Sequence, residues 1–217
     1  MHFTTIFFDL DDTLYPSSSG LWEAIRERMT RFMWERLGLP KEDVPGLRKR
    51  YFETYGTTLR GLQRHHGVDV DDYLAYVHGL PLAEFISPDP EVRSLILSLP
   101  QKRWIFTNAD AAHAVRVLEQ LNLSDCFEGI IDVRLLGFVC KPEPEAYTLA
   151  LEFTGESDPA RCIMIDDSTS NLAGGKKAGF FTIFLNAFEE SSETDMSIHS
   201  LLDLRRCMPD LWRNHNG

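Results

Sequence analysis

The chain has 217 residues, which suffices for one large domain or for one domain that carries a second, smaller one. Hydrophobic residues make up 43% and charged residues 25% of it, values of an ordinary globular protein that exclude a disordered chain. Asp and Glu number 33 against 22 Lys and Arg, so the net charge is −11 and the basic surplus of a nucleic-acid binder is absent. We therefore expect no nucleic-acid polymer among its partners.

Cysteine spacing and hydropathy indicate the cellular compartment of the protein. No two of the four cysteines form a Cys-x-x-Cys pair, which favours reduced thiols. The apolar run Ile6–Phe8 stops at Asp9, too short for a secretory signal, and no run approaches the roughly 20 apolar residues of a membrane span. We expect a cytoplasmic protein without a membrane partner, and both a monomer and a homodimer remain open. The cysteines are Cys126, Cys140, Cys162 and Cys207.

Short apolar runs that end in polar clusters predict the strands of a buried sheet. Helical patterns lie between these runs, and strands that alternate with helices predict an α/β fold with a Rossmann-like, doubly wound parallel sheet. The predicted strands are 5–8, 103–106, 162–165 and 181–185, with a weaker candidate at 129–133. The predicted helices are 110–121, with Asp110 as N-cap, 144–153 and 171–178.

Residues 16–89 break this alternation. They contain helical patterns only, whereas a connection in such a sheet normally consists of one helix and two short loops. We expect an inserted, all-helical cap subdomain at 16–89 and an α/β core domain made of 1–15 and 90–217. The stripe of Trp22, Phe32 and Met33 predicts the core of the insert. The insert's helices are predicted at 21–37, 43–55, 58–66 and 71–78, and residues 189–195 are predicted to form an acidic surface loop.

Polar side chains collect where the predicted strands end. Because the carboxyl ends of parallel strands share one edge of the sheet, these side chains should lie together. At least four carboxylates at one edge repel one another unless a cation lies among them, and oxygen ligands of this kind suit Mg²⁺. A lysine and a threonine beside such an ion point to a phosphoryl group as the ligand. The residues are Asp9, Asp11, Thr107, Asn108, Lys141, Asp166 and Asp167.

Three other readings of local motifs are weaker. The Asp9–Pro16 segment is not an EF-hand loop, because Leu14 stands where that loop needs glycine and Gly20 where it needs glutamate. Gly174–Lys177 resembles a phosphate-binding loop but lacks the required serine or threonine, so it is interpreted as a helix end. His65 and His66 have no companion at metal-ligand spacing and are interpreted as a solvated helix end.

Taken together, the motifs resemble those of the haloacid dehalogenase-like (HAD) phosphohydrolases. Four motifs occur in chain order, and the insert after the first resembles the cap of one branch of the family. The segments 55–62, 106–110 and 141–147 resemble more narrowly the pyrimidine 5′-nucleotidase subgroup. The four motifs are Asp9-Leu-Asp-Asp-Thr-Leu, Phe-Thr107-Asn108, Lys141-Pro142 and Asp166-Asp-Ser-Thr-Ser-Asn171.

The resemblance implies a role for each motif residue. Asp9 would be the nucleophile that forms an aspartyl-phosphate, and Asp11 the general acid and base whose backbone carbonyl also binds Mg²⁺. Thr107 and the backbone N–H of Asn108 would hold phosphate oxygens, and Lys141 would pair with the phosphoryl group and Asp9. The family pattern favours Asp167 as the direct metal ligand and Asp166 as a ligand through water. Asp12 is expected to support the turn, and Ser168 and Asn171 to fix the last loop.

The resulting expectation is a Mg²⁺-dependent phosphomonoesterase with a small phosphate ester as substrate, in particular a pyrimidine nucleoside 5′-monophosphate. Alternatives are a phosphatase of sugar phosphates or other small metabolites, and a receiver-like phospho-acceptor module, which would lack the insert and the acid at Asp11. Substrate choice should lie in the cap, although its candidate residues could equally hold the cap helices together. These candidates are Tyr55, Thr57, Thr58 and Arg60.

Overall fold

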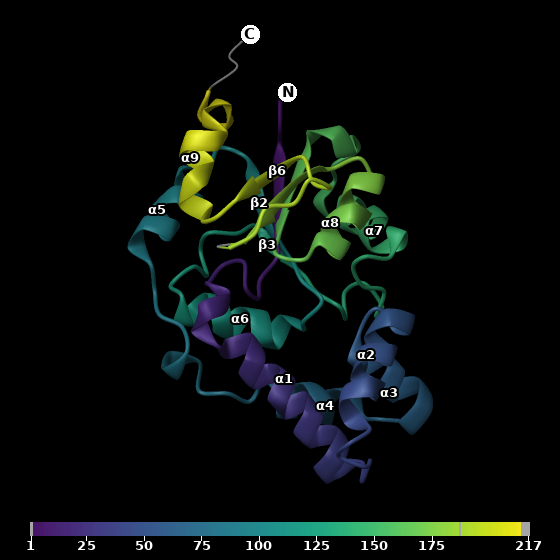
Figure 1. Ribbon diagram of the computed structural model, residues 1–217. Coiled ribbons are helices and arrows are strands. Elements are labelled where there is room, and N and C mark those ends of the chain that lie inside the picture. Colours follow the sequence, from purple (N-terminus) through teal and green to yellow (C-terminus); the bar gives the residue numbers. More distant parts are fainter. Residues whose placement is uncertain (1, 187, 214–217) are drawn as a thin grey trace. The chain divides into compact units, whose positions relative to one another are not determined.

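The computed structural model describes residues 2–186 and 188–213, and within them six parallel strands form one sheet (Figure 1). The strand order is β3-β2-β1-β4-β5-β6. Every predicted strand is present, and the α/β, doubly wound fold class is confirmed. The strands are β1 (Thr5–Phe8), β2 (Lys102–Phe106), β3 (Gly129–Ile131), β4 (Cys162–Asp166), β5 (Phe181–Leu185) and β6 (Met196–Ile198).

The order of the strands reverses between β1 and β4. From β1 the sheet grows through β2 to β3 on one side, and from β4 through β5 to β6 on the other. Phe8 lies opposite Ile105 on β2 and Ile165 on β4, so these three strands end at the same level. Ligands of open α/β sheets bind at such a switch point, beyond the carboxyl ends of the strands. The residues that follow Phe8 and Ile165 are therefore placed for function.

Helices cover both faces of this sheet, with α7 and α8 on one side and α5 and α9 on the other (Figure 1). The apolar cluster under α7 and α8 includes Phe7, Met164 and Tyr147, all of them buried. The second glycine of the Gly174–Lys177 segment lies against Met164, and the segment forms the last turn of α8, as the helix-end interpretation predicted. The helices are α5 (Pro90–Ser98), α6 (Ala111–Gln120), α7 (Pro144–Thr154), α8 (Thr169–Lys177) and α9 (Leu204–Cys207), with 3-10 turns at Pro159–Arg161, Leu201–Asp203 and Pro209–Trp212.

The chain divides into two compact units, and the second comprises Ser17–Ile86. Its described elements are all helical, and Phe32 packs edge-on against the buried Tyr73 at its centre. Trp22, predicted to belong to this core, is instead 37% exposed, because it lies one position past the buried stripe of Leu21 and Ile25. A cap function for this unit stays a prediction. Its elements are α1 (Leu21–Arg31), a π-helical turn (Phe32–Arg36), α2 (Val44–Tyr55), α3 (Thr58–His66), α4 (Val70–His78) and 3-10 turns at Ser17–Ser19 and Leu82–Glu84.

Two parts of the core unit differ from the sequence expectation. Strand β6 was not predicted, because its three residues are too few to show a pattern. The acidic segment 189–195 does form a surface loop, but Asp195 is anchored at its end. The Asp195 carboxylate accepts hydrogen bonds from the backbone N–H and hydroxyl of Thr182 and pairs with Lys176. The end of the loop is thus fixed to β5 and α8.

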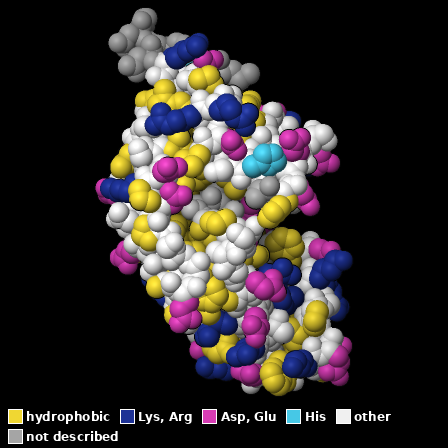
Figure 2. All heavy atoms as spheres, turned by 60° about the vertical axis from the view of Figure 1, so that its left-hand side comes forward, with side chains coloured by type: hydrophobic (Ala, Val, Ile, Leu, Met, Phe, Trp, Pro, Cys, Tyr) yellow, Lys and Arg dark blue, Asp and Glu magenta, His cyan; other side chains and the backbone are white. Residues whose placement is uncertain are grey.

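Charges of both signs mix on the surface. Figure 2 shows one face, on which Lys and Arg side chains alternate with Asp and Glu side chains and leave no large area of one sign. None of the helices in 2–186 and 188–213 has the length and apolar character needed to cross a bilayer. All four cysteines are free thiols, and three of them are buried.

Candidate active site

A buried lysine joins the two aspartates that end the central strands. Lys141 Nζ donates hydrogen bonds to Asp9 Oδ1 at 2.8 Å, to Asp166 Oδ2 at 2.7 Å and to the carbonyl oxygen of Phe106 at 2.6 Å. The Lys141 side chain has no exposed surface. Burial alone would lower the pKa of Lys141, but the carboxylates of Asp166 and Asp9 outweigh burial and raise it. Lys141 is therefore a fixed positive charge at the switch point.

Three carboxylates share the single ammonium group of Lys141 in this cluster. Asp9, Asp166 and Asp167 each offer an oxygen, and these atoms lie within 4.8 Å of one another. Burial raises the pKa of Asp9, Lys141 opposes this effect, and the two neighbouring carboxylates add to it. Burial, Asp166 and Asp12 raise the pKa of Asp167 to about 7. A divalent cation would relieve this repulsion, so the oxygen-only donor set fits Mg²⁺.

Asp166, the last residue of β4, and Asp167, which follows it, lie in different environments. Asp166 is fully buried and accepts hydrogen bonds on both oxygens, from the backbone N–H of Ser168, the amide of Asn171 and Lys141. Ser168 also caps the N-terminus of α8. The strand ends at Asp166, and the chain then turns, so the alternation of a strand does not carry Asp167 to the far face.

The predicted phosphate-binding residues lie beside this centre. Asn108 Oδ1 accepts from the backbone N–H of Lys141 at 2.9 Å, and Asn108 Nδ2 donates to the Lys141 carbonyl at 2.8 Å. Thr107 is 2% exposed, and its hydroxyl accepts from the backbone N–H of Ala109. The Asn108 side chain therefore holds the main chain of Lys141, a contact that the sequence did not reveal.

Asp11 stands in a different environment from Asp9, although only one residue separates them. Tyr15 Oη donates to Asp11 Oδ1 at 2.6 Å, and His113 Nε2 lies 2.9 Å from the same oxygen. Burial and the nearby Asp11 carboxylate raise the pKa of Tyr15, so its hydroxyl remains a donor. The sequence analysis did not single out His113. It lies on the buried face of α6 together with Val117, whereas Val115 is 44% exposed.

Asp12 forms part of the turn that follows Asp11. Its backbone is left-handed, with φ of 55°, and its Oδ1 is buried without a hydrogen-bond partner among residues 2–186 and 188–213. Burial and the charge of Asp11 raise the pKa of Asp12 to about 6. Its surroundings therefore oppose ionisation of Asp12.

The four candidate specificity residues all lie in the second unit. Thr57 caps α3 through a hydrogen bond from the backbone N–H of Arg60, and Thr58 is buried in the first turn. Arg60 Nη1 donates to the carbonyl oxygen of Tyr55, and the Tyr55 hydroxyl pairs with exposed His65. Thr57 and Thr58 thus stabilise the helix, and contact of Tyr55 or Arg60 with substrate stays a prediction.

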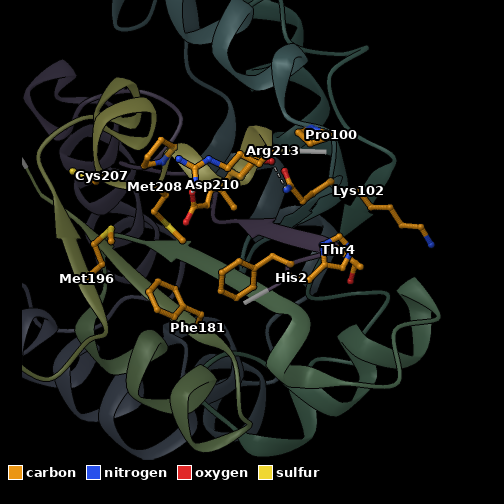
Figure 3. Close-up of a pocket in the computed structure, with 14 residues that line it drawn as sticks. His2, Thr4, Pro100, Lys102, Phe181, Met196, Cys207, Met208, Asp210 and Arg213 are labelled. Atoms are coloured by element: carbon orange, nitrogen blue, oxygen red, sulfur yellow. Dashed lines mark hydrogen bonds and ion pairs between the residues drawn. The ribbon is translucent and has the colours of Figure 1, made fainter. Parts of the chain in front are cut away.

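A cavity of about 630 Å³ lies at the amino ends of the strands, at the end of the sheet opposite to the carboxylate cluster (Figure 3). Its walls include Phe3 before β1, Lys102 at the start of β2, Phe181 at the start of β5 and Met196 at the start of β6. These are the amino ends of the strands, whereas Asp9 and Asp166 lie at the carboxyl ends. The cavity is therefore separate from the carboxylate cluster.

Fold and site together define an α/β protein with a buried lysine–carboxylate centre at the switch point of a doubly wound sheet. The model of the haloacid dehalogenase-like hydrolase family matches residues 3–179 of the chain. The chain therefore belongs to the haloacid dehalogenase-like hydrolase family, as the motif resemblance implied.

The chain is similar to a phosphate metabolism protein, a nucleotidase and a phosphatase. Phosphate metabolism protein 8 of Saccharomyces cerevisiae is 30% identical over 80% of this chain, which spans only 58% of that relative's length. Pyrimidine 5′-nucleotidase YjjG of Escherichia coli is 29% identical over 86% of this chain and 88% of its own length. Phosphoglycolate phosphatase of Caulobacter vibrioides is 30% identical over 92% of this chain and 88% of its own.

A solved structure supports the fold. The HAD-hydrolase YfnB of Bacillus subtilis, determined with bound magnesium, superposes with a TM-score of 0.64. The alignment covers 95% of this chain and 98% of YfnB at 21% sequence identity.

Proposed function

We propose that this protein is a Mg²⁺-dependent phosphomonoesterase that hydrolyses a small phosphate ester through an aspartyl-phosphate on Asp9. The observation that carries the proposal is the pair of environments at one strand end. Asp9 contacts a buried ammonium group, whereas Asp11 contacts the hydroxyl of Tyr15 and the imidazole of His113. A nucleophile and a general acid need this kind of difference.

In the first step an oxygen of Asp9 attacks the phosphorus atom, and the bond from phosphorus to the ester oxygen breaks. The departing alkoxide takes the proton of the Asp11 carboxyl group. In the second step the Asp11 carboxylate removes a proton from a water molecule, whose oxygen attacks the phosphorus of the aspartyl-phosphate. The bond from phosphorus to Asp9 then breaks, so that inorganic phosphate leaves and both aspartates return to their starting states.

The residues around Asp9 stabilise the charge that develops on the phosphoryl oxygens. Lys141 supplies a positive charge 2.8 Å from Asp9 Oδ1. The hydroxyl of Thr107 and the backbone N–H of Asn108 are proposed to donate to the phosphoryl oxygens. Uncatalysed hydrolysis of phosphate monoesters is so slow that enzymes accelerate it by up to ~10²¹-fold, which requires all of these groups together.

The ion would be held by Asp9, Asp167 and the backbone carbonyl of Asp11. Asp166 would act through water, because Ser168, Asn171 and Lys141 already donate to its two oxygens. When bound, Mg²⁺ would supply positive charge that allows a carboxylate to approach a phosphate dianion.

We propose a pyrimidine nucleoside 5′-monophosphate as the substrate. The support is the resemblance of three segments to that subgroup and the similarity to YjjG over most of both chains. The similarity to phosphoglycolate phosphatase supports a second candidate, a small phosphorylated metabolite that carries no base. Both candidates require the same chemistry at Asp9.

The test is phosphate release with Mg²⁺ from a panel of UMP, CMP, dTMP, AMP, GMP, phosphoglycolate, sugar phosphates and a lysophospholipid phosphate. Asp9→Asn and EDTA should each abolish release. Asp43→Asn is a matched control, because Asp43 is exposed and makes no side-chain capping bond. Preference for pyrimidine monophosphates would support both chemistry and substrate. Activity on metabolites alone would refute the nucleotide, and stable phosphorylation of Asp9 without turnover would indicate a receiver-like protein.

A further inference from the structure

One buried side chain in the core unit touches the proposed acid but belongs to none of the four motifs. His113 lies in the first turn of α6, 102 positions from Asp11 in the sequence. Its side chain has no exposed surface, and its Nε2 atom lies 2.9 Å from Asp11 Oδ1, whose own side chain is 13% exposed. A wholly buried imidazole at hydrogen-bond distance from a carboxylate is held there by the fold, since burial without a partner would be costly.

The element that carries His113 is itself fixed at its N-terminus. Asp132, the buried residue after β3, accepts a hydrogen bond from the backbone N–H of Ala111 at 2.7 Å and one from that of Leu135 at 2.8 Å. Asp110 stands at the N-cap position, as predicted, but its side chain makes no capping bond. Asp132 therefore positions the first turn of α6, and with it His113.

Tyr15 and His113 both reach the same oxygen of Asp11, Oδ1. Both contacts fall on one oxygen and come from side chains in different parts of the chain, so they hold the carboxyl group in one rotamer. Precise placement of an acid matters because proton transfer requires hydrogen-bond distance to the departing oxygen.

We propose that His113 is a positioning residue that fixes the carboxyl group of Asp11 for proton transfer to the leaving group. This inference rests on the proposed function, because it needs a phosphate ester whose alkoxide leaves. It adds to the proposed function the residue that orients the carboxyl group of Asp11. His113 touches neither substrate nor ion in this scheme and acts only through Asp11.

The leaving group distinguishes positioning from a merely structural role. An alkyl phosphate such as UMP releases a strongly basic alkoxide that needs the proton of Asp11. The phenolate of p-nitrophenyl phosphate is a far weaker base and departs without one. In the step that forms the aspartyl-phosphate, a misplaced acid therefore slows the alkyl substrate and spares p-nitrophenyl phosphate, whereas a general distortion of the site slows both.

The experiment compares kcat/KM for UMP, or for the best alkyl substrate of the panel, with kcat/KM for p-nitrophenyl phosphate. This ratio reports only the steps up to departure of the alcohol, whereas kcat also includes hydrolysis of the aspartyl-phosphate, in which Asp11 acts as the base for both substrates. We expect His113→Leu to lower kcat/KM for the alkyl substrate by about 10–100-fold and kcat/KM for p-nitrophenyl phosphate by less than about 3-fold. His113→Gln, whose amide nitrogen can take the place of Nε2, should recover most of the loss. Val115→Ala is the matched control, since Val115 is exposed on the same helix.

A double-mutant cycle completes the test. In an Asp11→Asn background, His113→Leu should have no further effect on the alkyl substrate, because the group it positions is gone. Equal losses on both substrates, no recovery with His113→Gln, or additive losses in the cycle would each overturn the positioning role. If His113→Leu does not fold, His113→Gln and Tyr15→Phe carry the comparison. Absence of phosphate release from every ester by the wild-type protein would instead overturn the proposed function.

Discussion

Replacement of Lys141 by methionine tests whether this lysine neutralises the centre of the site. Methionine keeps an unbranched apolar side chain and removes the ammonium group, so Asp9 and Asp166 stay buried without their shared cation. Lys141 has no exposed surface, and its three hydrogen bonds measure 2.6–2.8 Å. Removal of one partner from a buried ion pair costs about 3–5 kcal/mol. We expect the free energy of unfolding to fall by about 4 kcal/mol, a large part of the 5–15 kcal/mol of a typical domain.

The assay is urea denaturation of wild-type and Lys141→Met protein near neutral pH in EDTA. Lys176→Met is the matched control, because Lys176 pairs with Asp195 at a similar distance of 2.9 Å but is 45% exposed. An exposed pair is worth at most about 1 kcal/mol, so this control should lose little. A second variant, Lys141→Met combined with Asp9→Asn, removes one of the two stranded carboxylates and should regain part of the lost stability.

Two results would refute this reasoning about Lys141. The first is a loss in Lys141→Met no larger than that of Lys176→Met, which would mean that the buried carboxylates do not need the cation. The second is a double variant less stable than Lys141→Met alone, which would mean that Asp9 stabilises the fold through contacts other than the ion pair.

Three further predictions use the same measurement. Asp12 and Asp167 have pKa values raised to about 6 and about 7, so the folded protein binds these protons more tightly than the unfolded chain. Stability in EDTA should therefore fall as pH rises from about 4 to about 7, by at most about 6 kcal/mol for the two shifts together, and Mg²⁺ should remove most of this decline, whereas a flat profile would contradict both shifts. Gly174→Ala should destabilise by about 1–3 kcal/mol, because the new Cβ would lie 2.5 Å from the Tyr147 hydroxyl oxygen, while Gly46→Ala in α2, with nothing within 4 Å, should stabilise slightly. Asn108→Ala should lower the free energy of unfolding by about 2 kcal/mol, because both hydrogen bonds to the Lys141 main chain are lost. An unchanged midpoint of urea denaturation would show that these two hydrogen bonds do not stabilise the fold.

The strand ends could be read from the sequence because each is marked locally. A buried strand such as β4 is a continuous apolar run, and the first polar residue after it, Asp166 or Asp9, marks the edge of the sheet. Helix ends carry a similar local mark, because Gly155 and Gly179 both adopt positive φ at the ends of α7 and α8. Strand ends and helix ends depend on residues a few positions apart, so a single sequence is enough to predict them.

Contacts between residues far apart in the chain could not be predicted from such local patterns. Asn108 clamps Lys141 across 33 positions, and His113 meets Asp11 across 102. No local pattern encodes such a pairing, since it exists only after β1, β2 and α6 have packed. The one available signal was the position of His113, four residues before Val117 on the face of α6 that is buried.

The first motif shows why these distant partners matter. Asp9 and Asp11 have the same side chain and lie two positions apart, so sequence alone gives them no physical reason to differ. In the folded protein Asp9 contacts an ammonium group that favours its charged form, whereas Asp11 contacts a phenol hydroxyl and an imidazole at a single oxygen. The resemblance to a known family supplied the two roles in advance. The physical basis of the difference is the set of side chains that the sheet and α6 bring to each carboxyl group, so a change at Lys141 or His113 should affect one aspartate and spare the other.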